Sequence, residues 1–410
     1  MGNVAVEDEE LVGKKCGART CDRVRGLMTP YLVHEEPGLY RDVFRGWKLK
    51  TLWYNAQNMK RHNQRIIVRG CRIVSPGELT SDKRSVLIRD GLVEDILPDD
   101  DIPTDAQIYD FPGQVIAPCF CDHHLHFSAS AAGDLSETAG RLHAHGITKA
   151  YEGGDAAGTG LGIRNCLADK LKIVCSGRGL FKAGGYGKYI GQPVTDAEQA
   201  KSAIDTLLAE RADYIKIVQS GIYDPVTDSI TAGGFDRKEL GEMIGYAKDK
   251  GLPVFCHANG ADAVQAAVEE GSSAIIHGLR VSDDTLSEMC GRNVLFIPTL
   301  QAFRSIRRFP GSAEAMENLE RAVDGHLAAV SRAYEKGVTV LPGSDAGPSF
   351  IPYGTSFIEE LGLMMKAGIP YDHVIRSSAA CPLERNRCAD LLVLEGFEIK
   401  GVFLRGKLIR

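Results

Sequence analysis

From about residue 105 onward, short apolar runs alternate with segments whose apolar residues recur every three or four positions. The runs have the length of β-strands, and the segments between them have the periodicity of amphipathic helices. The runs are GQVIAPCF, ITKAYEG, LKIVCSG, DYIKIVQSG, LPVFCHANG, SSAIIHG, NVLFIPTL and GVTVLPGSD. Eight strands joined by helical crossovers predict an α/β protein built as a (β/α)8 barrel of the TIM type.

Two of the predicted helices carry clear start signals. Asp236 and Glu239 have the spacing of a capping box, and Gly251 predicts where that helix ends. A second helix is predicted to open at Thr195, with Glu198 in its third position. The apolar stripes are Leu240, Met243, Ile244 and Ala247 in the first, and Ala203, Ile204, Leu207 and Leu208 in the second. Each stripe should pack against the sheet, because helix propensity alone is marginal in water.

The two ends of the chain differ from the barrel pattern. Residues 66–112 and 388–410 both read as short strands separated by Gly, Pro and Asp. Because chain termini often lie close together, these ends are predicted to form one small β-sandwich domain. The barrel domain then spans residues 113–387, and residues 1–65 form an N-terminal extension without an assignable structure.

An open, doubly wound sheet is the alternative to a barrel. Such a sheet normally has a glycine-rich phosphate-binding turn after its first strand. In this sequence that position holds histidines, in the stretch APCFCDHHLHF over residues 117–127. The barrel is therefore favoured.

The amino-acid composition limits the classes of protein to which this chain can belong. The formal net charge of −6 predicts no nucleic-acid surface. No apolar run is as long as a membrane span, and the first residues lack the pattern of a signal peptide. Eleven cysteines, several inside apolar runs, are typical of reduced thiols that pack as small hydrophobes. A cytoplasmic protein without membrane attachment is the expectation.

The stretch APCFCDHHLHF offers six side chains that bind metals elsewhere. Successive side chains of a strand point to opposite faces, so Asp122, His124 and His126 should share the face that lines the barrel. Cys119, Cys121 and His123 should take the other face and pack under the helices. Two histidines at i and i+2 can then bind one ion, with Asp122 beneath them as an orienting group.

Other strand ends strengthen the metal interpretation. His257 ends LPVFCHANG, His277 ends SSAIIHG, and Asp345 ends GVTVLPGSD. Each alone is better explained as a core histidine or a helix-capping aspartate. Together they would meet at the carboxyl ends of parallel strands, where barrel active sites lie. Imidazole and carboxylate are ligands that Zn²⁺ prefers.

These motifs, in this order, resemble the amidohydrolase superfamily. The most similar branch contains imidazolonepropionase-like and Xaa-Pro dipeptidase-like enzymes with a lysine in the fourth strand. The resemblance covers roughly residues 66–410 and rests on APCFCDHHLHF, ADYIKIVQSG, VFCHANG, AIIHG, IPTL, GSDAG and ADLLVLEG.

The resemblance implies a binuclear metal site. Its ligands would be His124, His126, Lys216, His257, His277 and Asp345. A lysine ammonium has no lone pair, so Lys216 could simply neutralise a buried carboxylate such as Asp122. The family implies instead that Lys216 reacts with CO2 and that its carbamate bridges two divalent ions, most often Zn²⁺.

The implied reaction is hydrolysis of a C–N bond in a small amide or dipeptide-like substrate. Metal-activated hydroxide would attack the carbonyl, and Asp345 would carry the proton to the leaving nitrogen. A mononuclear deaminase or cyclic-amide hydrolase is the first alternative, although Gly260 stands where such deaminases usually place a glutamate. A non-catalytic scaffold is the second, although no ligand is missing.

Departures from the family pattern concern the substrate. Cys119 replaces a glycine of the first motif, and the connector ACPLERNRC is short. Relatives often hold a substrate-facing histidine in the loop after the third strand. The candidates for substrate contact here are Tyr186, Lys188 and Tyr189 in that loop and Arg280 after the sixth strand. The sequence leaves open the substrate, the metal in use and whether the chain forms a homo-oligomer.

Overall fold

The computed structural model describes residues 65–74, 79–80, 82–99, 103–127, 135–309 and 311–410. The extension predicted over residues 1–65 lies outside this part of the chain, apart from Arg65. By residue contacts, Arg61–Arg410 form one unit. The division of this unit into sandwich and barrel domains therefore stays a prediction.

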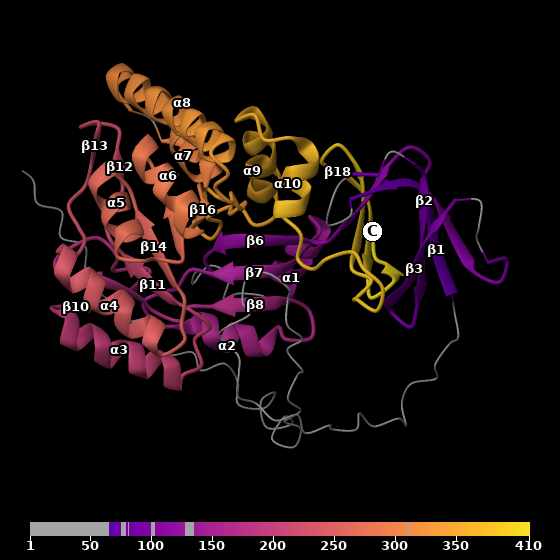
Figure 1. Cartoon of the computed structure of the whole chain (residues 1–410), viewed down its shortest axis with the longest axis horizontal. Helices are drawn as coiled ribbons and strands as arrows, with labels where there is room; N and C mark the ends of the chain where they lie inside the picture. The colour runs from indigo at the N-terminus through magenta and orange to yellow at the C-terminus, as the bar shows by residue number, and fades with distance from the viewer. Residues whose placement is uncertain (1–64, 75–78, 81, 100–102, 128–134, 310) are drawn as a thin grey trace, which may run out of the picture. The chain divides into compact units, whose positions relative to one another are not determined.

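Both ends of this unit contribute strands to one sheet, in which yellow C-terminal strands lie beside indigo N-terminal ones (Figure 1). Its order is β19-β18-β17-β5-β1-β2-β3, and β4 pairs with β1. The strands are β1 (Arg65–Ile73), β2 (Arg84–Arg89), β3 (Leu92–Pro98), β4 (Gln107–Asp110), β5 (Val115–Pro118), β17 (Leu391–Glu395), β18 (Glu398–Leu404) and β19 (Lys407–Leu408). The register of β1 shifts between Val68 and Cys71, which bends the sheet. Tyr109 of β4 packs against Phe403 of β18 in a core that both ends of the unit share.

The middle of the chain has the TIM-barrel-like α/β architecture that the sequence predicts. One parallel ladder has the order β10-β9-β11-β14-β15-β16, and another has the order β6-β7-β8. The strands are β6 (Phe120–Leu125), β7 (Ile147–Glu152), β8 (Lys172–Cys175), β9 (Gly179–Lys182), β10 (Gly191–Val194), β11 (Ile215–Val218), β14 (Val254–Ala258), β15 (Ala274–His277) and β16 (Leu295–Ile297). A separate hairpin, β12 (Tyr223–Asp224) and β13 (Ser229–Ile230), follows β11.

The eighth predicted run is an extended segment that joins the two ladders by a few backbone hydrogen bonds. The amide of Leu341 donates to Phe296 O in β16 at 2.8 Å. On the other side, the amide of Asp345 donates to His124 O, and that of His126 to Ala346 O, both at 2.7 Å. The prediction of a full strand over 337–345 is therefore wrong, although the segment occupies the eighth strand's place between β16 and β6.

One other strand prediction needs correction. The run over 113–120 ends in the eight-stranded sheet, because β5 pairs with β1 and β17, and the first barrel strand is the next element, β6. The third run, LKIVCSG, matches β8, which pairs with β7. The sequence did not single out β9, which follows this run and pairs with β11.

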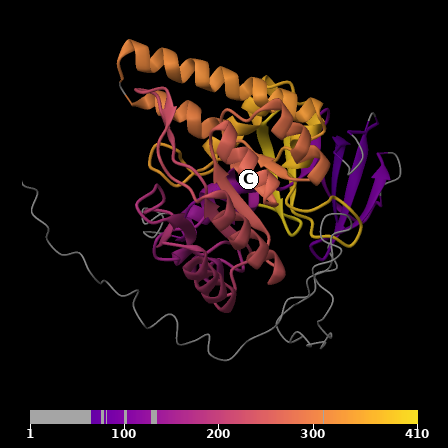
Figure 2. The same cartoon turned by 60° about the vertical axis from the view of Figure 1, so that its left-hand side comes forward.

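The helices pack on the outer side of the parallel strands (Figures 1 and 2). They are α1 (Leu135–Ala144), α2 (Thr159–Cys166), α3 (Ala197–Ala209), α4 (Arg237–Asp249), α5 (Ala261–Glu269), α6 (Asp283–Arg292), α7 (Leu300–Ser305), α8 (Ala313–Glu335), α9 (Thr355–Lys366) and α10 (Tyr371–Ser377), with a 3₁₀ turn over Ile306–Arg308. The capping box of Asp236 and Glu239 and the predicted buried stripe of α4 are confirmed. In α3 the N-cap is Asp196 instead of Thr195, and Leu208 is 38% exposed, so this helix lies one residue further along than predicted.

Successive side chains of the strands point alternately into two different hydrophobic cores. Ile215, Ile217 and Cys256 belong to the core that the strands share with the helices. Tyr214, Phe255 and other residues of the opposite parity form a second core on the inner side. Residues at the carboxyl ends of these strands whose side chains also point to the inner side therefore lie close to one another.

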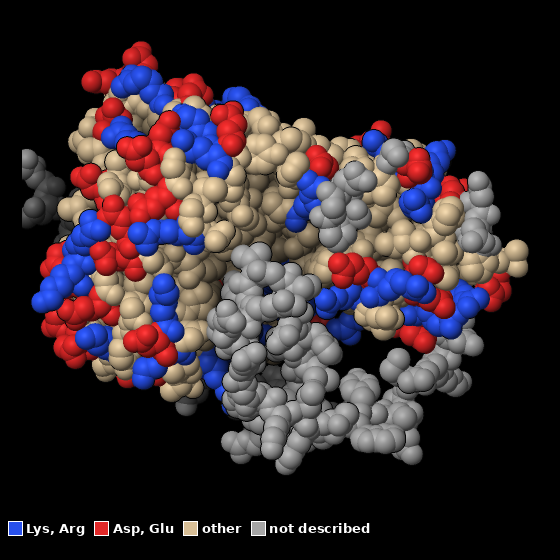
Figure 3. All heavy atoms as spheres, in the orientation of Figure 1, with Lys and Arg blue, Asp and Glu red and all other residues tan. Residues whose placement is uncertain are grey.

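The surface and the cysteines fit the composition. Acidic and basic side chains are mixed on the face shown in Figure 3, without a field of one sign. The nine cysteines in the described residues are all free thiols. Within the same residues, every helix is too short or too polar to cross a membrane.

Candidate metal centre

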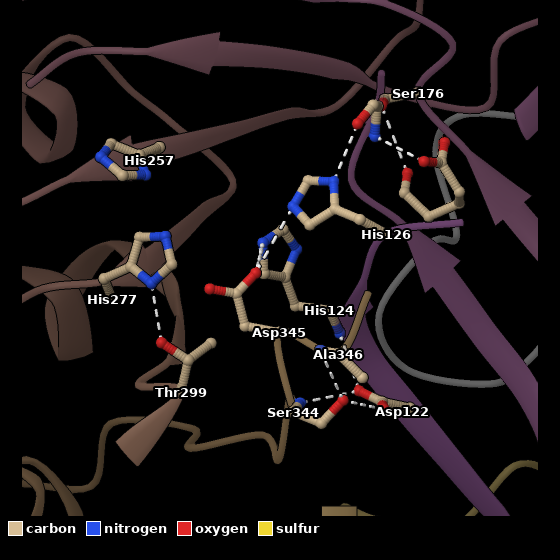
Figure 4. A network of polar contacts seen from close by, with 12 residues as sticks. Asp122, His124, His126, Ser176, His257, His277, Thr299, Ser344, Asp345 and Ala346 are labelled. Carbon is tan, nitrogen blue, oxygen red and sulfur yellow. Dashed lines mark hydrogen bonds and ion pairs between the residues drawn. The ribbon is translucent and has the colours of Figure 1, made fainter. Parts of the chain in front are cut away.

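Four histidines converge at the carboxyl ends of β6, β14 and β15 (Figure 4). The ring centroids of His124 and His126 are 4.9 Å apart, and those of His257 and His277 are 4.5 Å apart. His124 and His277 link the two pairs at 5.7 Å. Three of the rings are nearly inaccessible to water, because His124, His257 and His277 are at most 7% exposed.

Asp345 projects into the middle of these rings, as Figure 4 shows. Its Oδ1 lies 3.4 Å from Nε2 of both His124 and His126. The nearest ligand atoms of His124, His277 and Asp345 lie within 4.8 Å of one another, a spacing that one metal ion can bridge. Burial opposes ionisation of this carboxyl, but contact with the two histidines outweighs it and holds the pKa of Asp345 well below its usual range.

Three of the four histidine rings are held by hydrogen bonds, whereas the ring of His124 has none to the described residues. His126 Nδ1 lies 2.8 Å from Gly154 O, and His277 Nδ1 lies 2.7 Å from Thr299 Oγ1. These bonds leave Nε2 of each ring free to bind a metal. His257 is held through Nε2 instead, 3.0 Å from Gly221 O. The sequence carried no signal for these partners, since each comes from a loop far away along the chain.

Burial keeps His124, His257 and His277 in the neutral form that binds metals. Burial, and next the charge of Lys216, lower the pKa of His124 to about 3 and that of His257 to about 4. Neutral imidazole has the lone pair that a cation needs. Both rings are therefore ready to coordinate near neutral pH.

The backbone around the four histidines and Asp345 is strained and closely packed. His277, Thr299 and Asp345 have φ values of 74°, 49° and 55°, in the left-handed region that side chains rarely adopt. A Cβ added to Gly153 would lie 2.5 Å from His124 Cε1 and 2.7 Å from His126 Cε1. Strain of this kind persists only where the surroundings impose it, and it gathers at functional sites.

Asp122 is the orienting group expected beneath the first two histidines. It is fully buried and accepts hydrogen bonds from Ser344 Oγ at 2.5 Å, Ser344 N at 2.9 Å and His124 N at 3.2 Å. Burial raises the pKa of Asp122 to about 7. The carboxyl thus joins the His124 segment to the segment that carries Asp345.

Lys216 lies on the inner side of β11 without any water contact. Its Nζ has no hydrogen-bond partner among the described residues, and Asp122 is bonded to Ser344 and His124 instead. Lys216 therefore forms no hydrogen bond with Asp122, although the charges of Asp345 and Glu152 act on its amine. Burial lowers the pKa of the Lys216 amine to about 8, which brings the neutral, nucleophilic amine within reach of physiological pH. An orphaned amine in a buried site fits a lysine that is chemically modified when the site is complete.

The strand-parity rule fails for His123. This ring stacks on Tyr151, with centroids 5.4 Å apart, and Tyr151 packs against the inner core. The register of β6 shifts between Asp122 and Leu125, so consecutive histidines face inward. His123 still serves packing, as predicted, because its Nδ1 lies 3.1 Å from the carbonyl oxygen of Pro342. Cys119 is fully buried and packs, as predicted, but its Sγ lies 4.0 Å from Phe403 O of β18 instead of under a helix.

Of the four candidates for substrate contact, the structure brings Tyr186 to the histidines. Its ring centroid lies 5.4 Å from that of His257. Burial, and next the charge of Asp345, raise the pKa of the Tyr186 phenol to about 12. Tyr189 is 75% exposed and lies under the Lys188 ammonium, and Arg280 is paired with Asp228 at 2.5 Å.

Glu152 is a buried residue of the site that the sequence did not single out. Its Oε1 accepts a hydrogen bond from Gly154 N at 2.9 Å, and its Oε2 accepts one from Cys175 Sγ at 3.1 Å. Gly154 in turn supplies the carbonyl that holds His126. Glu152 thus fixes the turn that orients His126. Its place as the last residue of β7 was the one available signal.

Comparison with solved structures finds proteins of the same fold. A crystal structure of a Xaa-Pro dipeptidase with bound methionine in the active site has a TM-score of 0.70 and 19% identity, covering 85% of this chain and 100% of that one. The A. niger ochratoxinase structure has a TM-score of 0.71 and 18% identity, with 85% and 96% coverage. Molinate hydrolase has a TM-score of 0.64 and 14% identity, with 85% and 95% coverage. At these identities the likeness establishes the fold.

Curated relatives match a shorter region. An uncharacterised protein of Mycobacterium tuberculosis is 27% identical over 223 residues, which cover 52% of this chain and 57% of that protein. A Mycobacterium bovis protein matches equally well. The chain thus spans little more than half the length of the curated relatives that it matches.

The family model described as the amidohydrolase family matches residues 115–385. This range runs from β5 to the connector after α10 and includes every strand end that carries the histidines, Lys216 and Asp345. It confirms the family to which the sequence motifs pointed: the chain belongs to the amidohydrolase family.

Proposed function

We propose that this protein is a metal-dependent hydrolase that cleaves a C–N bond of a small amide or dipeptide-like substrate. One observation carries the proposal: four histidines and Asp345 meet beside a buried lysine whose amine has no partner among the described residues. Membership of the amidohydrolase family and fold neighbours that include a dipeptidase and a hydrolase support it.

The donor set suits two divalent ions, of which Zn²⁺ is the best match for imidazole and carboxylate. The proposed ligands are His124, His126, His257, His277, Asp345 and a carbamate formed from the Lys216 amine and CO2. When bound, such ions supply Lewis acidity and lower the pKa of water to about 7.

Asp345 is the proposed proton carrier. As the oxygen of water forms a bond to the carbonyl carbon of the substrate, the carboxylate takes the proton that this oxygen loses. It then passes that proton to the nitrogen as the C–N bond breaks. The depressed pKa of Asp345 supports this role, since the group is ionised when the cycle starts.

A deaminase is the less favoured alternative. The position where such an enzyme would need its glutamate is Gly260, whose φ of 86° disfavours any side chain. A non-catalytic scaffold is disfavoured because decay of function would remove ligands first, and each predicted ligand is present.

Removing the metal is expected to abolish hydrolysis. The protein would be dialysed against a chelator and assayed before and after Zn²⁺ is restored, on a panel of dipeptides, N-acyl amino acids and lactams. We expect about two ions per chain in the active form, because the resemblance to the family implies that a carbamate on Lys216 bridges two ions. Full metal content with no turnover on any amide would favour a scaffold, and ammonia release from amino-heterocycles would favour a deaminase.

Thr299→Val tests the hydrogen bond that holds His277. Valine keeps the branched shape but cannot bond to Nδ1, so metal affinity should fall by about 10- to 100-fold. Affinity would be measured by competition with a chromogenic chelator. Thr206→Val, in which an exposed hydroxyl on α3 is lost, is the matched control. Equal affinities for the two variants would show that Thr299 does not tune the site.

A further inference from the structure

Thr299, which holds His277, has a backbone conformation that a threonine rarely adopts. Its φ and ψ are 49° and 45°, in the left-handed region. It directly precedes α7, where a threonine hydroxyl usually accepts a hydrogen bond from one of the first amides of the helix. The Thr299 hydroxyl makes no such bond and lies 2.7 Å from His277 Nδ1 instead (Figure 4). Other groups must therefore hold the first turn of α7 and the strained residue before it.

Glu360 binds the amides that the threonine leaves free. It is a fully buried residue of α9, 60 positions after Leu300. Its Oε1 accepts a hydrogen bond from Leu300 N at 3.0 Å, and its Oε2 accepts one from Gln301 N at 2.7 Å. Burial raises the pKa of Glu360 to about 8, and these two bonds oppose that rise because they favour the ionised carboxyl. Glu360 thus caps the first turn of α7 from a different helix.

The residue before Thr299 is held as well. The ring of His326, a buried residue of α8, donates from Nε2 to Pro298 O at 2.9 Å. Thr299 therefore lies between a carbonyl fixed by α8 and two amides fixed by α9. Backbone strain persists only where the surroundings impose it, and these bonds supply that restraint.

The Thr299 hydroxyl has two possible partners. In an ordinary helix start it would accept a hydrogen bond from Gln301 N. Because Glu360 occupies that amide, the lone pairs of the hydroxyl stay available to His277. Loss of the carboxyl would release the amide and remove one restraint on the left-handed backbone. The hydroxyl would then turn to its own helix and leave His277 Nδ1.

We infer that Glu360 is a positioning residue for His277, acting through the first turn of α7 and the hydroxyl of Thr299. The inference rests on the proposed function for the claim that His277 binds a metal. Both oxygens of Glu360 are bonded to amides of α7, so its geometric influence on the histidines runs through that turn. The charge of Asp345 also acts on Glu360, so a test has to separate geometry from charge.

Glu360→Gln tests the inference, because glutamine keeps the size of the side chain but its nitrogen cannot accept a hydrogen bond from an amide. We expect metal affinity to fall by about 10- to 100-fold, as in Thr299→Val. The variant with both changes should lose no more than Thr299→Val alone, because both changes remove the same bond to His277. Two independent effects would multiply instead. Affinity would be measured by competition with a chromogenic chelator.

The ring of His277 reports the same link in metal-free protein. Nitrogen-15 NMR of histidine-labelled protein should show its ring signals displaced in the same direction in Glu360→Gln and in Thr299→Val, and His277→Asn identifies these signals. Glu359→Gln is the matched control, because Glu359 is the preceding residue of α9 and binds the side chain of Gln301 instead of its amide. It should match the wild type in metal affinity and in the His277 signals.

Glu360→Asp separates position from charge. Aspartate keeps the carboxylate but is one methylene shorter, so it cannot reach both amides, and metal affinity should fall as in Glu360→Gln. This variant also takes the place of Glu360→Gln in the comparison with Thr299→Val if the glutamine variant does not fold. Wild-type affinity in Glu360→Asp, beside a loss in Glu360→Gln, would indicate an effect of charge and overturn the inference.

The outcomes separate this inference from the proposed function. Losses that multiply in the double variant, or wild-type His277 signals in Glu360→Gln, would overturn the role of Glu360 and leave the hydrolase intact. A wild type that binds no metal would overturn the proposed function. The His277 signals of the metal-free protein would then still decide whether Glu360 acts through Thr299.

Discussion

Asp345→Asn is expected to reduce kcat by at least about 1000-fold while leaving the metal content close to that of the wild type. General acid–base catalysis contributes about 100- to 10,000-fold, and Asp345 is assigned both proton transfers. Asparagine keeps an oxygen in the place of Oδ1, 3.4 Å from His124 and His126, but it cannot take up a proton. Single-turnover rates and metal analysis of the same preparation would measure the two effects separately.

Asp283→Asn is the matched control for this change. Asp283 is an exposed carboxylate that pairs with Arg332 at 2.6 Å on the surface of the barrel. Its loss should leave kcat unchanged. If Asp345→Asn kept its metal and more than a tenth of the wild-type kcat, another group would have to carry the proton.

Lys216→Ala is expected to lower both metal content and activity. An outer partner of a metal ligand is worth about 10- to 100-fold in metal affinity, and loss of a bridging ligand should cost more. Because Lys216 is fully buried, its removal also leaves a cavity beside the histidines. A small carboxylate such as propionate can enter that space and supply the missing anionic group. Propionate should therefore restore metal and turnover to this variant in a concentration-dependent way.

Lys182→Ala provides the comparison, because Lys182 lies on the neighbouring strand β9 but is paired with Glu239 at 2.5 Å. It should respond neither in metal content nor to propionate. One ion per chain in both the wild type and Lys216→Ala, with similar activity, would refute the binuclear site. Carbon-13 NMR of protein supplied with labelled bicarbonate would show the carbamate directly.

Local sequence signals were reliable where the structure depends on neighbours in the chain. The capping box of Asp236 and Glu239 and the buried stripe of α4 follow from spacing within one helix. The alternation of residues in β11 correctly placed Ile215 and Ile217 against the helices and Lys216 on the inner side. Regular alternation holds in this strand because its pairing with β14 proceeds without a shift.

Local sequence patterns gave wrong predictions where the structure depends on which strands pair and in which register. The apolar run over 113–120 cannot show that β5 joins the eight-stranded sheet, since that depends on β17 near the other end of the chain. The parity of His123 was wrong because β6 slips its register against β7. A one-residue shift in register reverses the face of the sheet to which each side chain points. Nothing in the sequence FCDHHL of β6 indicates such a shift.

The sequence by itself determined the residue types and their order: histidines, lysine and aspartate at the ends of successive apolar runs, in a pattern specific enough to name the family. The tertiary structure decided which nitrogen atoms of these side chains have a hydrogen-bond partner and which have none. Thr299, Gly154 and Gly221 hold three of the histidine rings, and Lys216 is left without a described hydrogen-bond partner. The hydrogen bonds that hold the rings join residues 22 to 36 positions apart. They form only after the strands have paired, so no local pattern can encode them.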